Sequence, residues 1–377
     1  MHTLPMTDDE LTGWLRLASA KGLRPAALRT LLEQFGLPDA VLGQPFASLA
    51  AVTDEATARA TLAAPDGGFA GYLDAVRAWR EGAANAVLTL GDPAYPPALL
   101  TMPDPPPLLY VKGRIELLHA RSVAVVGSRS ATPQGTEDAA RFARAFSNAG
   151  ITVVSGLALG IDGAAHRGAL AGPGSTVAVT GTGADLVYPS AHHALAHEIA
   201  AAGAIVTEWP LGTPARSSHF PQRNRLIAGL VSGVLIVEAA MRSGSLITAR
   251  LANEMGRDVF ALPGSIHAPL SRGCHRMIKQ GAKLVETPEE VLEELGAAPA
   301  VSGLQPLPTA ARPPSGLAPE AQRMLDALGH APATLEILAA RTDMDDTALQ
   351  SMLLQLELAG HLTVLPGGRF SRANNES

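Results

Sequence analysis

The chain reads Ser-Val-Ala-Val-Val-Gly-Ser-Arg-Ser-Ala-Thr-Pro over residues 122–133. A mainly apolar, β-branched run ends at Gly127, and Thr132 followed by Pro133 can cap and begin a helix. Such a run is typical of a strand that is buried on both faces of a parallel sheet. The stretch therefore predicts one strand-turn-helix unit of an α/β protein.

The same pattern returns along the chain. Short β-branched runs, each followed by a turn of small residues and a helical pattern, occupy residues 151–154, 176–180, 204–207, 233–237 and 258–262. We predict an α/β fold built on a doubly wound, mainly parallel sheet. In such a sheet the ligand lies outside the carboxyl ends of the strands, which is where these turns fall.

Charge is distributed unevenly. Residues 121–285 contain 15 Arg and Lys against nine Asp and Glu, a net charge of +6. The rest of the chain contains 14 against 26, or −12, so that the whole chain has a net charge of −6. A cationic domain inside an acidic protein indicates a polyanionic ligand that is held by that domain alone.

Other features exclude several classes of protein. Cys274 is the only cysteine, which rules out an internal disulfide and fits a reducing cytoplasm. The acidic N-terminal residues lack the apolar run of a signal peptide, and no apolar run approaches the length of a membrane span. We expect a cytoplasmic protein without a membrane partner.

The length of 377 residues suits two or three domains. The first region contains short amphipathic helical patterns, such as residues 9–20 and 25–35, and the last predicts helices followed by a β-wing. The predicted boundaries are 1–84 for a helical domain, 85–295 for the sheet domain, 296–317 for a Pro-rich linker and 318–377 for a winged-helix-like domain.

The predicted recognition helix of the last domain, residues 345–359, contains no Lys or Arg. A helix that enters a DNA groove beside phosphates normally carries basic residues. We therefore expect this domain to bind protein or to regulate, and not to grip DNA.

The turn after the first strand can bind an anion. The backbone N–H groups of Gly127 and Ser128 near a helix N-terminus favour negative charge, and Arg129 adds a bidentate cation. The alternative is a tight turn with a solvated arginine. A dinucleotide site needs a three-glycine pattern at the first turn and an acidic residue at the end of the second strand, but here the first turn has one glycine and the second strand ends in Ser155 and Gly156. The sequence therefore argues against a nicotinamide-dependent dehydrogenase.

Two further segments suit a nucleic acid. Arg223, Asn224 and Arg225 follow Phe220 at a helix start and can supply phosphate, base-edge and stacking contacts together. A surface-exposed helix start is the alternative. Residues 243–245, Ser-Gly-Ser, repeat the pattern of small residues at a strand end. In the second turn we expect Asp162 to cap a helix and His166 to pack or to stabilise the turn.

Metal, cofactor and covalent chemistry have weak support. His193 and His197 are four residues apart, but no third ligand completes a metal site. Cys274 and His275 lack an orienting third group, so packing is favoured over a thiol nucleophile. We predict no catalytic residue, no metal and no cofactor.

At this point the chain resembles the DNA-processing protein A (DprA, also called Smf) family. The resemblance spans about 95–286 and depends on many motifs in one order and at matching spacing. These are residues 95–96, 107–113, 126–129, 155–162, 188–189, 220–225, 243–249, 256–264 and 273–275.

The resemblance implies a cytoplasmic bacterial protein that binds and protects incoming single-stranded DNA during natural transformation and loads the RecA recombinase onto it. It also implies an extended Rossmann-like domain, a homodimer and no catalytic turnover. The N-terminal region is similar to a SAM-like or helix-hairpin-helix domain, although its hairpin has Gly22 and no second glycine. The implied DNA-contacting residues are Gly127, Ser128, Arg129, Gly156, Gly160, Phe220, Arg223, Asn224, Arg225, Ser243, Gly244 and Ser245.

A sheet edge offers a physical reason for a dimer. Residues 283–285 follow the last predicted helix of the sheet domain, and an uncovered apolar edge invites pairing with a second copy. We expect His275, Ile278 and Leu284 to take part in self-association.

A rival hypothesis is a nucleotide-processing enzyme. The core is also similar to phosphoribohydrolases, whose Pro-Gly-Gly-x-Gly-Thr-x-x-Glu motif ends in a catalytic glutamate. When the motif is aligned on Thr248, that glutamate falls at Leu251, so the carboxylate is lost. A protein-binding scaffold, the third hypothesis, leaves the cationic block unexplained.

Overall fold

The computed structural model describes residues 6–296, 319–328, 333–342, 344–365 and 368–373. The chain forms two compact units, residues 1–300 and residues 301–377. The predicted linker, apart from Gly296, lies outside the described residues. Within the described ranges no helix is long and apolar enough to cross a membrane.

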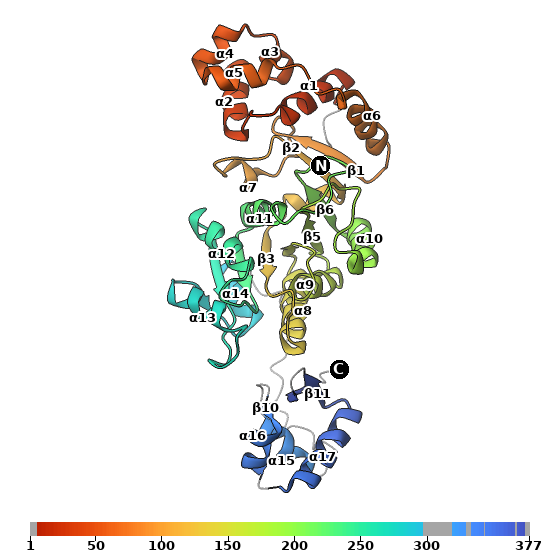
Figure 1. Ribbon diagram of the computed structural model, residues 1–377, viewed down its shortest axis with the longest axis vertical. Coiled ribbons are helices and arrows are strands. Elements are labelled where there is room, and N and C mark those ends of the chain that lie inside the picture. Colours follow the sequence, from red (N-terminus) through yellow and green to blue (C-terminus); the bar gives the residue numbers. More distant parts are fainter. Residues whose placement is uncertain (1–5, 297–318, 329–332, 343, 366–367, 374–377) are drawn as a thin grey trace. The chain divides into compact units, whose positions relative to one another are not determined.

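The first unit is built on a nine-stranded sheet within residues 6–296, with the order β1-β2-β6-β5-β4-β3-β7-β8-β9 (Figure 1). All neighbours from β6 to β9 are parallel, while β2 is antiparallel to β6 and β1 to β2. The strands are β1 (Asn85–Thr89), β2 (Leu108–Gly113), β3 (Ser122–Val126), β4 (Thr152–Ser155), β5 (Thr176–Val179), β6 (Ala204–Thr207), β7 (Gly233–Ile236), β8 (Asp258–Ala261) and β9 (Lys283–Leu284).

The predicted doubly wound, mainly parallel fold is confirmed, and the six predicted strands are β3 to β8. The sequence interpretation missed β1 and β2, which it treated as a Pro-rich approach to the sheet. Prolines at 105–107 precede β2 directly and conceal the strand pattern.

Alternate residues of the central strands enter different cores. In β3, Val123 and Val125 pack on one side, and Ala124 and Val126 pack on the other. One face is covered by α7 (Pro97–Leu100), α11 (His219–Leu230), α12 (Ser245–Glu254) and α13 (Arg272–Lys279). The other face is covered by α8 (Pro133–Asn148), α9 (Ile161–Leu170), α10 (His193–Ala202) and α14 (Pro288–Glu294). Burial on both faces explains the continuous β-branched runs.

The N-terminal region is helical, as predicted. The expected helices are α1 (Asp8–Ser19) and α2 (Pro25–Phe35), and Gly36 ends α2 with a φ of 92°. Apolar residues of α1 share a core with β1 and β2, including Trp14, Val87 and Tyr110. The remaining helices here are α3 (Pro38–Leu42), α4 (Phe46–Val52), α5 (Glu55–Leu62) and α6 (Phe69–Arg80).

The second unit contains α15 (Pro319–Leu328), α16 (Leu335–Thr342) and α17 (Asp346–Leu358) with a sheet of order β10-β12-β11. Its strands are β10 (Ala333–Thr334), β11 (Leu362–Leu365) and β12 (Arg369–Arg372). Helix α17 is the predicted recognition helix, capped by the Asp345 carboxylate. Leu354 and Leu358 on this helix are 56% and 81% exposed. An acidic, partly apolar surface supports the expectation of a protein contact.

Candidate nucleic-acid interface

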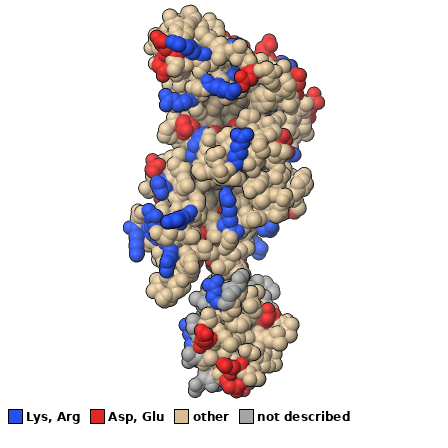
Figure 2. All heavy atoms as spheres, in the orientation of Figure 1, with Lys and Arg blue, Asp and Glu red and all other residues tan. Residues whose placement is uncertain are grey.

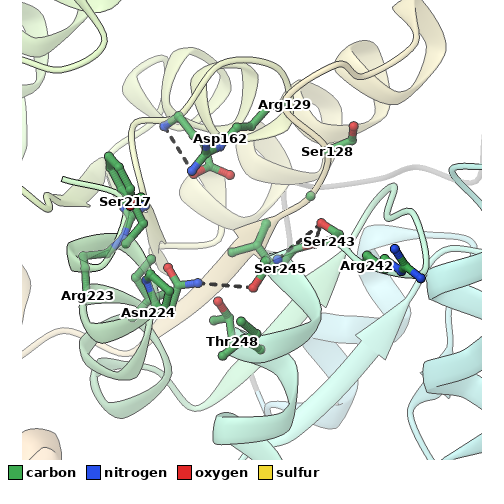
Figure 3. Close-up of a pocket in the computed structure, with 18 of the residues that line it drawn as sticks. Ser128, Arg129, Asp162, Ser217, Arg223, Asn224, Arg242, Ser243, Ser245 and Thr248 are labelled. Carbon is green, nitrogen blue, oxygen red and sulfur yellow. Dashed lines mark hydrogen bonds between the residues drawn. The ribbon is translucent and has the colours of Figure 1, made fainter. Parts of the chain in front are cut away.

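A cavity of about 720 Å³ opens at the carboxyl ends of the central strands (Figure 3). Its walls come from the loop after β3, the start of α9, the first turns of α11 and the loop between β7 and α12. These segments meet because β4, β3 and β7 are parallel neighbours that end at one edge of the sheet. Nine predicted site residues line the cavity: Gly127, Ser128, Arg129, Phe220, Arg223, Asn224, Ser243, Gly244 and Ser245.

The cavity is strongly cationic. Arg129, Arg216 and Arg242 line it with exposed side chains, and none of them forms an ion pair with a residue that the structure describes. Arg223 adds a buried guanidinium, and Asp162 is the one carboxylate among the described lining residues. A hollow lined by one sign of charge concentrates counter-ions, so this arrangement selects an anionic ligand.

Asp162 is held by its own loop. Its Oδ2 accepts hydrogen bonds from the N–H groups of Gly156 at 3.1 Å and Ala158 at 3.3 Å. Burial raises its pKa, and the charge of Arg223 opposes this effect. The expectation that Asp162 caps a helix was wrong, because Gly160 occupies the N-cap position of α9.

The helix N-termini at this edge differ. Thr132 caps α8 as predicted, but Glu238 accepts hydrogen bonds from the Thr132 N–H at 2.9 Å and hydroxyl at 2.6 Å. A carboxylate therefore already occupies the N-terminus of α8, contrary to our expectation for the turn at Gly127. Helix α12 has no acidic residue in its first turn, and Gly244 and Ser245 at its start line the cavity. The N-terminus of α12 is therefore suited to an anion.

Aromatic rings lie beside the cations. The Arg129 guanidinium lies 5.2 Å from the centroid of the Phe220 ring, and the centroid of the Tyr188 ring lies 5.6 Å from that same centroid. Tyr188 is 48% exposed, and with Leu159 and Phe220 it lines an adjoining hollow of about 90 Å³. The exposed Tyr188 ring and the half-buried Phe220 ring beside guanidinium groups offer stacking faces to planar bases.

Arg223 is buried beneath the cavity. Its Nη1 donates a hydrogen bond to the Val179 carbonyl at 2.6 Å. Burial lowers its pKa to about 10, so that it stays charged at neutral pH. A Cβ at Gly156 would lie 2.0 Å from this guanidinium, which explains the glycine there. Arg223 contributes its charge and braces the floor, whereas Gly156 lines only the adjoining hollow.

Asn224 connects two walls of the cavity. Its Nδ2 donates a hydrogen bond to the Gly244 carbonyl at 3.2 Å (Figure 3). The hydroxyls of Ser243 and Ser245 are 2.6 Å apart in the same loop. These bonds position the start of α12 against α11, so that the three small residues keep their place around the anion site.

Arg225 does not reach the cavity. Its Nη2 pairs with the Glu208 carboxylate and its Nη1 donates to the Asp104 carbonyl at 2.7 Å. Burial raises the pKa of Glu208 to about 7, and the Arg225 charge opposes the shift. The sequence assigned Arg225 to DNA, but the structure places it in a buried ion pair, so it is removed from the candidate interface.

Gly160 also lies outside the cavity and has a packing role. It has a φ of 72°, and a Cβ there would lie 2.3 Å from the Ser128 carbonyl oxygen. The glycine lets the loop before α9 approach the turn that carries Arg129. His166 stabilises the same loop as expected, because its Nε2 accepts from the Leu157 N–H at 3.2 Å.

The sequence interpretation did not assign Arg216, Arg242, Leu159 or Tyr188 to the site. Arg216 and Arg242 were counted in the cationic block, and both follow the carboxyl end of a strand. That position was a usable signal for the two arginines. Leu159 and Tyr188 also follow strand ends, but neither carries the charge that marks an anion site, and their exposure depends on how two distant loops fold.

Among the described residues, the structure does not bring together side chains for metal binding or for thiol catalysis. Within the described ranges, no group of three or more His, Cys, Asp or Glu side chains could hold a metal ion. Cys274 is buried, and burial raises its pKa to about 12, which disfavours a thiolate nucleophile.

The sheet edge predicted for self-association is present. Strand β9 pairs with β8 only, and Leu284 on it is 47% exposed. On the neighbouring helix, Ile278 is half-buried, and the His275 ring lies 3.0 Å from the Gly264 carbonyl oxygen. Self-association through these residues stays a prediction.

Two parts of the chain match known families. Residues 86–296 match the family described as DNA recombination-mediator protein A. The chain belongs to this family. Residues 308–368 match the DprA winged helix domain, which confirms the predicted C-terminal domain.

Relatives and solved structures agree with the family. Protein Smf of Escherichia coli K12 is 42% identical over 78% of this chain and 80% of its own length. The DNA processing protein DprA of Streptococcus pneumoniae R6 is 48% identical over 54% of this chain and 72% of its own. The X-ray structure of DprA from Streptococcus pneumoniae superposes with a TM-score of 0.65 and 37% identity, covering 77% of this chain and 99% of that one.

A second solved structure bears on the ligand. DNA processing protein A from Helicobacter pylori superposes with a TM-score of 0.52 and 30% identity, covering 56% of this chain and 95% of that chain. That protein is described by its single-stranded DNA binding mode.

Proposed function

We propose that this protein binds single-stranded DNA in the cavity at the carboxyl edge of the sheet and acts there as a recombination mediator. The observation that carries the proposal is a combination in one hollow. Three exposed arginines without an ion pair to any described residue lie there with the N-terminus of α12 and the Phe220 and Tyr188 rings. Phosphates match the cations and the helix N-terminus, and bases match the rings.

The rings favour a single strand over a duplex. Phe220 and Tyr188 can stack only on bases that are not paired and stacked within a helix. The single-stranded DNA binding of the Helicobacter pylori relative supports the same ligand class.

The family supports the biological role. Membership in a recombination-mediator family favours a protein that receives incoming DNA during natural transformation, protects it and loads RecA onto it. We propose that it does so in the cytoplasm as a homodimer, with the exposed edge at β9 as the contact between copies.

A phosphoribohydrolase-like activity has little support. Leu251, at the position of the catalytic glutamate, packs against the apolar core. Asp162 is the one carboxylate among the described residues that line the cavity, and it accepts hydrogen bonds from two backbone N–H groups. Without a free carboxylate the anion site lacks a general acid or base, so we propose that the protein has no catalytic turnover.

Salt dependence tests DNA binding. Three exposed cavity arginines predict a log-log slope of affinity against salt of about −2 for a short oligo-dT, since each contact contributes about −0.7. Duplex of equal length is expected to bind more weakly. Equal affinity for duplex, or a slope near zero, contradicts the proposal.

Two assays test the role and the rival activity. Addition of the protein to RecA and single-stranded DNA covered by a single-strand binding protein should shorten the lag of strand exchange, and Arg129→Ala should restore the lag. Incubation with nucleoside monophosphates should release no free base. Robust release would favour the enzyme hypothesis.

A further inference from the structure

A second cationic surface lies outside the cavity, on α13. Arg272, Arg276 and Lys279 are exposed, and their spacing places them on one face of the helix. Cys274 and Met277 on the opposite face are buried in the core. Figure 2 shows Lys and Arg side chains gathered over α13 and its surroundings. We call Arg272, Arg276 and Lys279 the α13 strip.

The cations of the α13 strip have no carboxylate partners within the described part of the chain. Ion pairs in residues 121–285 involve Arg141, Arg225 and Lys283 instead. The acidic helix α14 packs on α8, across the sheet from α13. Like charges four residues apart on a helix repel each other, so the strip carries a cost that an anionic ligand would remove.

The strip continues from the cavity. The Gly273 N–H donates to the Ala239 carbonyl at 2.8 Å, and the Ala239 N–H donates to the Leu270 carbonyl at 2.6 Å. A Cβ at Gly273 would lie 2.4 Å from the Ala239 carbonyl oxygen, so the helix start lies directly against this loop. The next residues of the loop, Ala240 and Arg242, line the cavity.

We propose that the DNA strand leaves the cavity past Arg242 and continues along the α13 strip. The proposal rests on the proposed DNA binding and extends its footprint. Arg272 and Lys279 are seven residues apart, which is about 10 Å along a helix. Stacked nucleotides rise about 3.4 Å each along one strand, so this length accommodates at most about three phosphates, enough for one at each cation.

A comparison of two oligonucleotide lengths tests the path. An oligo-dT of about six nucleotides fits the lower end of known single-strand sites and fills the cavity alone, whereas one of about thirty also covers the strip. For the short oligonucleotide we expect a salt slope of about −2, and for the long one about −4, since six cations then meet phosphates.

The triple variant Arg272→Ala, Arg276→Ala, Lys279→Ala isolates the strip. It should bind the short oligonucleotide within twofold of the wild type, while its slope for the long one falls to about −2. For a matched control, the double variant Arg272→Ala, Arg276→Ala is compared with a second double variant, Arg144→Ala, Arg167→Ala. The second variant removes two exposed arginines from α8 and α9, on the other face of the sheet. The control pair should leave both slopes unchanged.

Three outcomes are separable. If the wild type binds neither length, the proposed function fails. If the triple variant binds the long oligonucleotide with the wild-type slope, the α13 path is overturned and an acidic protein surface becomes the better partner. If sedimentation shows that the triple variant no longer self-associates, the strip belongs to the contact between copies at α13, and the path is likewise overturned.

Discussion

The loops around the cavity and the inner side of α11 both carry arginines, and they use them differently. Arg129, Arg216 and Arg242 are exposed and without an ion pair among the described residues. Arg223 is buried against a strand carbonyl, and Arg225 is mostly buried against Glu208. The comparison teaches that the surroundings of an arginine, and not the motif that contains it, decide whether it serves the ligand or the fold.

Arg225→Met should have the largest effect, on stability. Removing one partner of a buried ion pair leaves the Glu208 carboxylate without its cation, and we expect a loss of about 3–5 kcal/mol in the free energy of unfolding. Urea unfolding at pH 8 measures it. The folded variant should bind oligo-dT within twofold of the wild type, and a selective loss of binding would return Arg225 to the interface.

Glu208→Gln should flatten the pH dependence of stability. The pKa of Glu208 is raised from 4.5 to about 7, so the folded state favours the protonated carboxyl. Its contribution is present below pH 4.5 and is lost as the pH rises through 7, a difference of about 3 kcal/mol. Urea unfolding at pH 5 and pH 8 should show the wild type losing stability relative to the variant. If the stabilities of the wild type and the variant change equally between pH 5 and pH 8, the argument that burial raises the pKa of Glu208 is contradicted.

Arg129→Ala should weaken DNA binding and leave stability almost unchanged, the opposite of Arg225→Met. Loss of a charge-assisted phosphate contact is expected to cost about 2 kcal/mol of binding, or roughly 30-fold in affinity, and to lower the salt slope by about 0.7. The free energy of unfolding should change by less than about 0.5 kcal/mol, because the side chain is exposed. Fluorescence anisotropy measures the binding, and urea unfolding of the same preparation measures the stability. Together they show whether Arg129 serves the ligand or the fold.

Phe220→Leu should weaken single-strand binding by about 1–2 kcal/mol through the loss of stacking. Phe220 lies between the cavity and the adjoining hollow, so its ring serves the bases and not the phosphates. The salt slope is therefore expected to stay unchanged while the affinity falls. A changed slope would show that the ring acts through Arg129.

Deletion of residues 301–377 should have the smallest effect on DNA. These residues form their own compact unit, and α17 contains no Lys or Arg. We expect oligo-dT affinity within twofold of the full chain. A tenfold loss would show that the second unit carries part of the DNA site.

The sequence predicted the parallel sheet well, because strands buried on both faces leave continuous β-branched runs. It also predicted a site at the edge where the cavity opens, since glycine turns follow those runs. It could not separate Arg129 from Arg225, because the partner Glu208 comes from a different strand end. Likewise, Glu238 binds Thr132 although the two are 106 positions apart in the sequence, so no local pattern shows that the Glu238 carboxylate occupies the α8 N-terminus.

Glu238 makes the two helix starts near the cavity unlike. On the side of α8 a carboxylate occupies the helix start, while on the side of α12 the start is free of acidic residues. A DNA strand has a chemical direction, and its 5′-to-3′ and 3′-to-5′ placements present sugars and bases differently to such walls. For the proposed single strand, such an asymmetry would favour one polarity in the cavity.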